Sequence, residues 1–236
     1  MLEIKHLTKT FGEKKAVDDL SLEIRNGEIY GFIGHNGAGK TTTLKSVCGI
    51  QSFDSGEITL DGIALDGDPM AFKKQIAYIP DNPDLYEYMS GIKYLNFIAD
   101  IFGVSSADRE GRIKKYADLF ELTGDLAQPI SAYSHGMKQK LVLISAWLHE
   151  PSLIVMDEPF VGLDPKASHI LKDMMREVCD RGGAIFFSTH VLEVAEKLCD
   201  KVAIIKNGKL IKSGTMEEVK GDSSLETVFL ELEEEK

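Results

Sequence analysis

The sequence predicts an α/β fold with a mixed sheet, an antiparallel β flank and an inserted helical subdomain, and three features of the chain indicate it. A strand, a glycine-rich loop and a helix follow one another in residues 28–48. Strands alternate with helices from residue 153 onward, as in α/β proteins. Between about 83 and 150, apolar residues recur only at helical spacing. We assign residues 1–236 to one domain, with the helical subdomain at about 83–150 inserted in its core.

The first strands are predicted from alternating side chains. Residues 2–7 and 20–25 alternate apolar and polar residues, which indicates two half-exposed antiparallel strands joined through Phe11 and Gly12. Residues 56–60 resemble a further strand of this flank. Residues 76–79 read as a short strand, because the proline that follows them has no N–H to donate to a sheet.

The remaining elements follow from periodicity. Apolar side chains at helical spacing predict helices around 94–98, 113–120 and 141–148 in the inserted subdomain. Beyond it we expect strands at 153–156, 184–187, 202–205 and 209–211, helices at 166–179 and 191–198, and a last helix at 224–232 before a charged, solvated end at 233–236.

The glycine-rich loop predicts nucleotide binding. It reads Gly34-x-x-x-x-Gly39-Lys40-Thr41 and joins a buried strand to a helix. Glycines let several backbone N–H groups approach a triphosphate, and the helix adds its unpaired donors and its dipole. In such a loop the lysine reaches the β- and γ-phosphates and the hydroxyl binds Mg²⁺, so we expect Lys40 and Thr41 in these roles. Thr42 is expected at a further phosphate oxygen. A chance match to the four fixed positions is about a one-in-a-hundred event in a chain of this length.

Two acids end the apolar strand at 153–156. Asp157 and Glu158 lie at its carboxyl end, the edge where ligands of α/β folds bind. Mg²⁺ prefers oxygen ligands, so Asp157 is expected to face the metal together with Thr41. Glu158 points elsewhere and could polarise an attacking water as a general base.

Two further residues allow two interpretations each. His190 follows the next strand and could hydrogen-bond a γ-phosphate and the water, but a lone histidine at a helix start is also typical of a cap-region residue. Ser134 is placed as the N-cap of a strongly apolar helix. That helix end is either a second phosphate site or only a well-capped helix.

The composition excludes some classes of protein. Lys and Arg (27) are outnumbered by Asp and Glu (38), and the net charge of -11 argues against a nucleic-acid partner. The three cysteines lack metal or redox spacing, as expected of reduced thiols in the cytoplasm. The longest apolar run, 141–148, is far shorter than the roughly 18 residues of a membrane span, and the first residues lack the apolar region of a secretory signal. Any membrane role is expected to come through a partner.

The order and spacing of these motifs resemble the nucleotide-binding subunit of an ABC transporter over essentially the whole chain. The matching segments are a Walker A loop at 34–42, a signature segment at 133–137, a Walker B strand at 153–158, a D-loop at 162–164 and a switch histidine, His190. The resemblance implies the ABC ATPase fold, with its P-loop NTPase core, and an ATPase that uses ATP and Mg²⁺. It also implies which residues hold ATP: Phe11, which stacks on the adenine, and Gly34, Asn36, Gly37, Ala38, Gly39, Lys40, Thr41 and Thr42.

In this family each ATP lies between the Walker A loop of one subunit and the signature helix of another. The resemblance therefore implies a second copy of the chain, or a homologous ATPase subunit, as partner. It assigns Ser134 and Gly136 to the partner's nucleotide, and it counts Asp164 of the D-loop among the nucleotide-binding residues. Glu158 and His190 are then catalytic. An integral membrane permease is also implied, which would place the chain in the cytoplasm at the inner face of the cell membrane.

Two segments depart from the family pattern. The signature, usually Leu-Ser-Gly-Gly-Gln, reads Tyr133-Ser134-His135-Gly136-Met137. The glutamine expected after the strand at 76–79 is Asp81, which when ionised accepts but does not donate a hydrogen bond and can ligate Mg²⁺. We assign Asp81 a catalytic and a metal-binding role. With the tail at 225–232, these departures resemble exporter-type ATPases of bacterial drug, lipid or polysaccharide efflux. The alternatives are a soluble ATPase of the same family without a transport role, a small-molecule P-loop kinase, and an ATP-binding regulator with weak hydrolysis.

Overall fold

Two sheets organise the chain. The computed structural model describes residues 1–234, without the side chains of 233 and 234, so the charged end expected at 233–236 lies outside the described side chains. The larger sheet has six strands, whose spatial order is β10 (Lys209–Thr215), β9 (Lys201–Lys206), β3 (Ile29–Ile33), β8 (Ala184–Thr189), β7 (Leu153–Asp157) and β6 (Ile76–Ile79). All its neighbours pair in parallel except β10 with β9. The smaller sheet is antiparallel, in the order β2 (Lys14–Ile24), β1 (Leu2–Phe11), β4 (Ser55–Leu60) and β5 (Ile63–Ala64). The predicted α/β fold with a mixed sheet and an antiparallel flank is confirmed.

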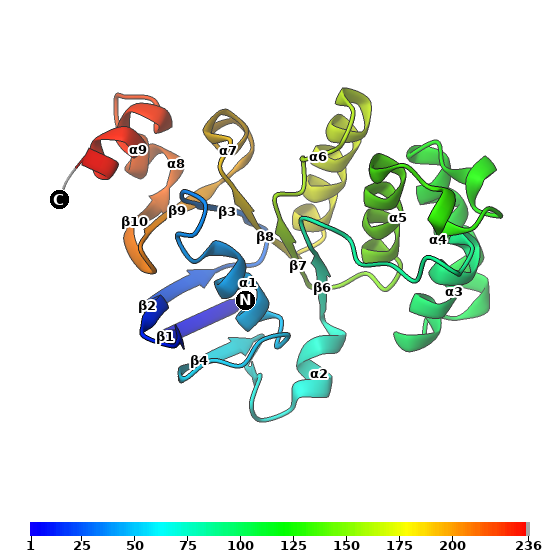
Figure 1. Ribbon diagram of the computed structural model, residues 1–236, viewed down its shortest axis with the longest axis horizontal. Helices are drawn as coiled ribbons and strands as arrows, with labels where there is room; N and C mark the ends of the chain where they lie inside the picture. The colour runs from blue at the N-terminus through cyan, green and yellow to red at the C-terminus, as the bar shows by residue number, and fades with distance from the viewer. Residues whose placement is uncertain (235–236) are drawn as a thin grey trace.

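The inner strands β3, β7 and β8 of the six-stranded sheet are buried at every position, because they are mostly apolar and the sheet is covered on both faces. In β7, Leu153 and Val155 pack toward the antiparallel sheet and α1 (Lys40–Val47). Ile154 and Met156 pack toward the helices α5 (His135–Trp147), α6 (Pro165–Asp180) and α7 (Leu192–Leu198). Alternate side chains of one strand thus enter two separate cores, as expected of a covered parallel sheet. Figure 1 shows this layering, with the antiparallel sheet at the lower left.

The described chain between β6 and β7 contains helices and no strand. Its elements are α3 (Gly91–Ile101), α4 (Ser106–Leu119), the short 3₁₀ turns η1 (Thr123–Asp125) and η2 (Ile130–Ala132), and α5. They stand at the right of Figure 1, and their apolar faces join the core on the helical side of the large sheet. The helices expected near 94–98, 113–120 and 141–148 are therefore present. The interpretation of 83–150 as an inserted subdomain stays a prediction.

Some elements differ from the prediction. The strands expected at 2–7 and 20–25 are longer, because β1 and β2 stay paired through register shifts up to the turn between Phe11 and Lys14. The strand expected at 209–211 continues to Thr215, where a capping box starts α8 (Met216–Lys220). We did not predict α8 or α2 (Pro69–Lys74). Both carry start signals, Asp68 before Pro69 and Thr215 with Glu218, that could have revealed them.

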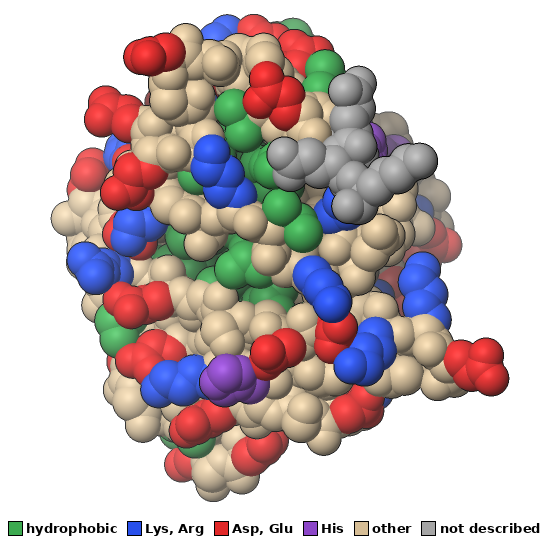
Figure 2. All heavy atoms as spheres, turned by 90° about the vertical axis from the view of Figure 1, so that its left-hand side faces the viewer, with side chains coloured by type: hydrophobic (Ala, Val, Ile, Leu, Met, Phe, Trp, Pro, Cys, Tyr) green, Lys and Arg blue, Asp and Glu red, His purple; other side chains and the backbone are tan. Residues whose placement is uncertain are grey.

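The last helix, α9 (Leu225–Glu234), packs beside α7 and α8 at the upper left of Figure 1. Figure 2 shows the face at that end of the molecule, where acidic and basic side chains intermingle around a hydrophobic middle and no basic stripe is visible. Among the described helices, none has the length and hydrophobicity that crossing a bilayer requires.

Candidate active site

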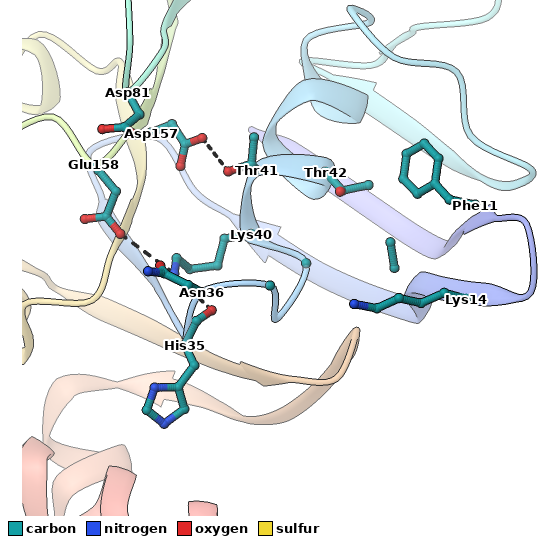
Figure 3. Close-up of a pocket in the computed structure, with 13 residues that line it drawn as sticks. Phe11, Lys14, His35, Asn36, Lys40, Thr41, Thr42, Asp81, Asp157 and Glu158 are labelled. Atoms are coloured by element: carbon teal, nitrogen blue, oxygen red, sulfur yellow. Dashed lines mark hydrogen bonds and ion pairs between the residues drawn. The ribbon is translucent and has the colours of Figure 1, made fainter.

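A pocket of about 390 Å³ lies at the carboxyl edge of the large sheet, beside the β1–β2 hairpin (Figure 3). Its volume is within the range of small-ligand sites, about 300 to 1,000 Å³. The sheet edge, the loop before α1 and the hairpin tip all contribute to it. The predicted residues that line it are Phe11, Asn36, Gly37, Gly39, Lys40, Thr41, Thr42, Asp81, Asp157 and Glu158.

The loop between β3 and α1 needs its glycines because of close contacts. Gly39 has φ 113°, a backbone conformation that favours glycine, and a Cβ there would collide with the Ala16 carbonyl oxygen. A Cβ at Gly34 would lie 2.5 Å from the Ile205 carbonyl oxygen. Both positions bring the loop backbone against neighbouring strands. The helix α1 begins directly afterwards at Lys40, and the residues of its first turn, Lys40, Thr41 and Thr42, line the pocket.

Lys40 is held inside the loop. Its side chain is only 6% exposed, and its ammonium donates to the carbonyl oxygen of Gly34 at 2.5 Å. The Glu158 Oε1 atom lies 3.7 Å from it. Burial lowers the pKa of Lys40, and the nearby carboxylates of Glu158 and Asp157 oppose that shift. The lysine is therefore a positioned cation at the end of the pocket where the two acids lie.

Asp157 is oriented by two hydroxyl groups. Thr41 Oγ1 donates to Asp157 Oδ2 at 2.6 Å, and Ser188 Oγ donates to Asp157 Oδ1 at 2.5 Å. Ser188 lies directly across from Asp157 in the pairing of β7 with β8. Sequence reasoning did not single out Ser188, although a serine at the end of the neighbouring strand was a usable signal. Thr41 and Asp157, expected to share a metal, do lie together.

Glu158 turns away from Asp157 because its backbone leaves the strand conformation. Its φ is 48°, a left-handed value unusual for a residue with a Cβ. The Glu158 backbone N–H is near Ser188, 3.2 Å from both its carbonyl oxygen and its Oγ. The Glu158 Oε1 atom lies 2.9 Å from His190 Nδ1. The structure thus joins Glu158, His190 and Lys40, three residues far apart in the sequence.

Two predicted residues stand at the rim of the pocket. Phe11 is at the hairpin tip, 51% exposed, with the Lys9 ammonium 5.2 Å from its ring centroid. Asp81 follows β6 and lines the pocket next to Asp157 and Glu158, as Figure 3 shows. The pocket therefore has an exposed aromatic ring at one end and acids at the other.

Ser134, Gly136 and Asp164 do not line this pocket. Ser134 caps α5, its hydroxyl accepting from the Met137 backbone N–H at 3.2 Å, as the sequence predicted. Asp164 caps α6 and forms an ion pair with Lys140 at 2.9 Å, and these bonds lower the pKa of Asp164. Two predicted residues of the glycine-rich loop also do not line this pocket. The Gly34 carbonyl oxygen accepts a hydrogen bond from Lys40, and Ala38 lines a smaller neighbouring hollow.

Three residues of the pocket were missed by sequence reasoning. They are Lys14, Ala16 and His35. Lys14 and Ala16 come from β2, a strand predicted to start only at residue 20, so the longer hairpin explains why they were overlooked. His35 lies inside the Walker A segment, and its ring contacts Phe229 of α9 at a centroid distance of 5.0 Å.

The pocket and the fold define a nucleotide-binding ATPase of the P-loop type, and comparison with known proteins gives the family. The family model described as ABC transporter matches residues 17–161, well over half of the chain. The chain therefore belongs to the ABC transporter family, as an ATP-binding subunit with ATPase activity.

Individual relatives agree with this placement. The chain is 35% identical to the ABC-type transporter ATP-binding protein EcsA of Bacillus subtilis (strain 168), over 100% of this chain and 97% of the relative. It is 32% identical to the Nod factor export ATP-binding protein I of Ralstonia nicotianae, over 93% of this chain and 68% of that protein. A solved ATP-binding subunit of an ABC transporter superposes with a TM-score of 0.95 at 36% identity, covering 99% of this chain and 100% of the other.

Proposed function

We propose that the chain is the ATPase subunit of an exporter-type ABC transporter, which pairs with a second ATPase subunit around two shared ATP molecules and drives a separate permease. The observation that carries the proposal is the convergence of Lys40, Thr41, Asp157 and Glu158 in one pocket. The relative whose name includes Nod factor export supports the direction of transport.

Phosphate binding would use the loop 34–39 and the start of α1. The loop glycines let backbone N–H groups face the pocket, and the first turn of α1 adds unpaired donors and a partial positive charge. Lys40 would exchange its carbonyl partners for the β- and γ-phosphates. Phe11 would stack on the base at the other end of the pocket.

The residues present fit a magnesium ion. A hydroxyl and a carboxylate, Thr41 and Asp157, already meet at 2.6 Å, and Asp81 lines the same pocket. These are the hard oxygen donors that Mg²⁺ takes, usually together with phosphate oxygens and water. The described residues contain no group of three or more His, Cys, Asp or Glu side chains that could hold a metal by themselves, so the nucleotide is needed to complete the ligand set. When bound, the ion would neutralise charge on the phosphates.

Hydrolysis would use Glu158 as the general base. Water forms a bond to the γ-phosphorus, the bond to the bridging oxygen breaks, and ADP leaves while Glu158 takes the proton of the water. His190 Nδ1, 2.9 Å from Glu158 Oε1, would orient that carboxylate and contact the γ-phosphate. The left-handed backbone of Glu158 keeps its side chain apart from Asp157.

The signature residues support sharing of the site between two subunits. Ser134 is exposed and lies outside the pocket, and Gly136 packs close to the Gly162 carbonyl oxygen of the D-loop. In a closed pair they would complete the pocket of the other subunit, as would Asp164. The permease would hold the pair at the inner face of the membrane.

Two substitutions test this function. Lys40→Ala should abolish ATP binding or nearly so, and Glu158→Gln should bind ATP normally while hydrolysis falls by about 100- to 10,000-fold. Titration with a fluorescent ATP analogue and a phosphate-release assay measure the two effects. Lys74→Ala, an exposed lysine on α2, is the matched control. Unchanged ATP affinity in Lys40→Ala would mean that the loop does not hold the phosphates.

A further inference from the structure

Lys14 lies at the tip of the β1–β2 hairpin, opposite Phe11. The two are paired across the antiparallel ladder, and residues directly opposite each other have their side chains on the same face of the sheet. Ala16, two residues further along β2, also lines the pocket, as the alternation of a strand requires. Phe11, Lys14 and Ala16 therefore present one face of the hairpin to the nucleotide pocket.

The Lys14 ammonium points toward the glycine-rich loop. Figure 3 shows its side chain extending from β2 in that direction, below Phe11. The same side chain borders the smaller hollow beside Asn36 and Gly37, so it stands next to the middle of the loop. Lys40 is at the other end of the pocket, near Glu158.

Among the described residues, no ion pair or hydrogen bond engages the Lys14 ammonium. Its neighbour Lys15 differs, since it forms an ion pair with Asp18 at 2.8 Å and lies outside the pocket. Within the described part of the chain, Lys14 is thus a cation without a protein partner, directed into the pocket that is proposed to bind a polyanion. Fixed positive charge at such a position favours an anionic ligand.

We infer that Lys14 is a nucleotide-binding residue whose ammonium contacts the α-phosphate of ATP or ADP. The inference rests on the proposed placement of ATP in this pocket, with its base on Phe11 and its β- and γ-phosphates at Lys40. The part of the nucleotide between these ends is the ribose and the α-phosphate, and only the α-phosphate carries a negative charge. Lys14 therefore recognises what ATP and ADP have in common, whereas Lys40 recognises the terminal phosphates.

Equilibrium titrations with ATP and with ADP test the assignment. Lys14→Ala should weaken both nucleotides by the same factor, about tenfold, which is typical of losing one charge-assisted contact. Lys14→Arg should stay close to the wild type because it keeps the charge. Lys15→Ala is the matched control, and its affinities should not change. The loss in Lys14→Ala should also shrink as salt is added, since the contact is near the surface.

Three results would overturn the inference. The first is an unchanged affinity of Lys14→Ala for both nucleotides. The second is a loss confined to ATP, which would place Lys14 at the γ-phosphate, and the third is an equal loss in Lys15→Ala, which would indicate a general effect of surface charge. Lys40→Ala is run in parallel to separate this inference from the proposed function. If Lys40→Ala loses ATP binding and Lys14→Ala does not, only the role of Lys14 fails. If Lys40→Ala binds ATP normally, the proposed placement of the nucleotide in this pocket is wrong, and the role of Lys14 that rests on it is wrong as well.

Discussion

Two acids that are adjacent in the chain have different surroundings at the active site. Asp157 is 3% exposed and accepts hydrogen bonds from Thr41 and Ser188, so both of its oxygens are engaged. Glu158 adopts a left-handed backbone and faces His190 and Lys40 instead. This division fits a metal-facing role for the first acid and a proton-accepting role for the second.

Asp81 provides a test at the residue scale. Asp81→Asn keeps the size of the side chain and removes its charge, so ATP should still bind while hydrolysis requires a higher Mg²⁺ concentration. Initial rates of phosphate release over a Mg²⁺ series measure the shift. Asp84→Asn, with the same change of charge at an exposed position three residues on, is the control. A Mg²⁺ dependence identical to the wild type would leave Asp81 only the mechanical role of linking the core to the helices.

At the scale of elements, the segment after β6 and the helix α3 form a groove of about 330 Å³. Tyr86 and Tyr88 are 47% and 79% exposed, and the Tyr86 ring contacts Phe97 at a centroid distance of 5.7 Å. Exposed aromatic residues are enriched in protein interfaces. A solvated loop is the alternative.

We expect the permease to dock on this groove, so replacing both Tyr86 and Tyr88 with alanine should weaken assembly of the complex and reduce transport while leaving ATP binding intact. Co-purification with the permease and a transport assay measure the effect. Met70→Ala, which removes an exposed apolar side chain on α2, is the control. If assembly and transport are both unaffected, docking occurs elsewhere.

His149 links the end of α5 to its neighbours. Its ring stacks on the Phe102 ring at a centroid distance of 3.7 Å, and its Nε2 lies 3.3 Å from the Ile76 carbonyl oxygen at the start of β6. Burial lowers the pKa of His149 from its ordinary value of 6.5 to about 4, and Arg112 contributes to the shift. The folded protein therefore disfavours the protonated ring.

This shift makes stability depend on pH. Between the unfolded pKa of 6.5 and the folded pKa of about 4, the unfolded chain binds more protons, so the free energy of unfolding should fall as the pH is lowered through that window, by up to about 3 kcal/mol. Above pH 6.5 the ring is neutral in both states, and the contribution of His149 to the free energy of unfolding is fully present. Denaturant titrations at several pH values should show the fall reduced in His149→Gln and retained in the exposed control His169→Gln. If the free energy of unfolding of His149→Gln falls with pH as much as that of the wild type, His149 is not the source of this loss of stability.

At the scale of the whole molecule, the predicted ATP contacts are separated within one chain. Lys40 and Thr41 line the pocket, whereas Ser134 and Gly136 lie at the start of α5, outside it. Under the proposed function, one copy would therefore present two half-sites, which a second copy would join. Unhydrolysed ATP should then hold two subunits together.

Glu158→Gln should consequently form a stable dimer with ATP and stay monomeric with ADP. Adding Ser134→Arg should abolish that dimer, because a large side chain would occupy the place of the partner's phosphate. Adding Ser106→Arg at an exposed position on α4 should not. Size-exclusion chromatography with light scattering gives the masses. A Glu158→Gln protein that binds ATP yet stays monomeric, alone and in the assembled complex with its permease, would disprove the shared site.

The sequence by itself determined the features that depend on neighbouring residues. The spacing from Gly34 to Thr41 predicts the loop, and the apolar run before Asp157 predicts a strand buried on both faces, because both signals are set by local backbone requirements. Only the tertiary structure decided which distant side chains meet. It brought Ser188 to Asp157 across the sheet and His190 to Glu158, and it placed Lys14 opposite Phe11. The register of strand pairing and the left-handed backbone of Glu158 set these contacts, and both are fixed by packing between segments far apart in the chain.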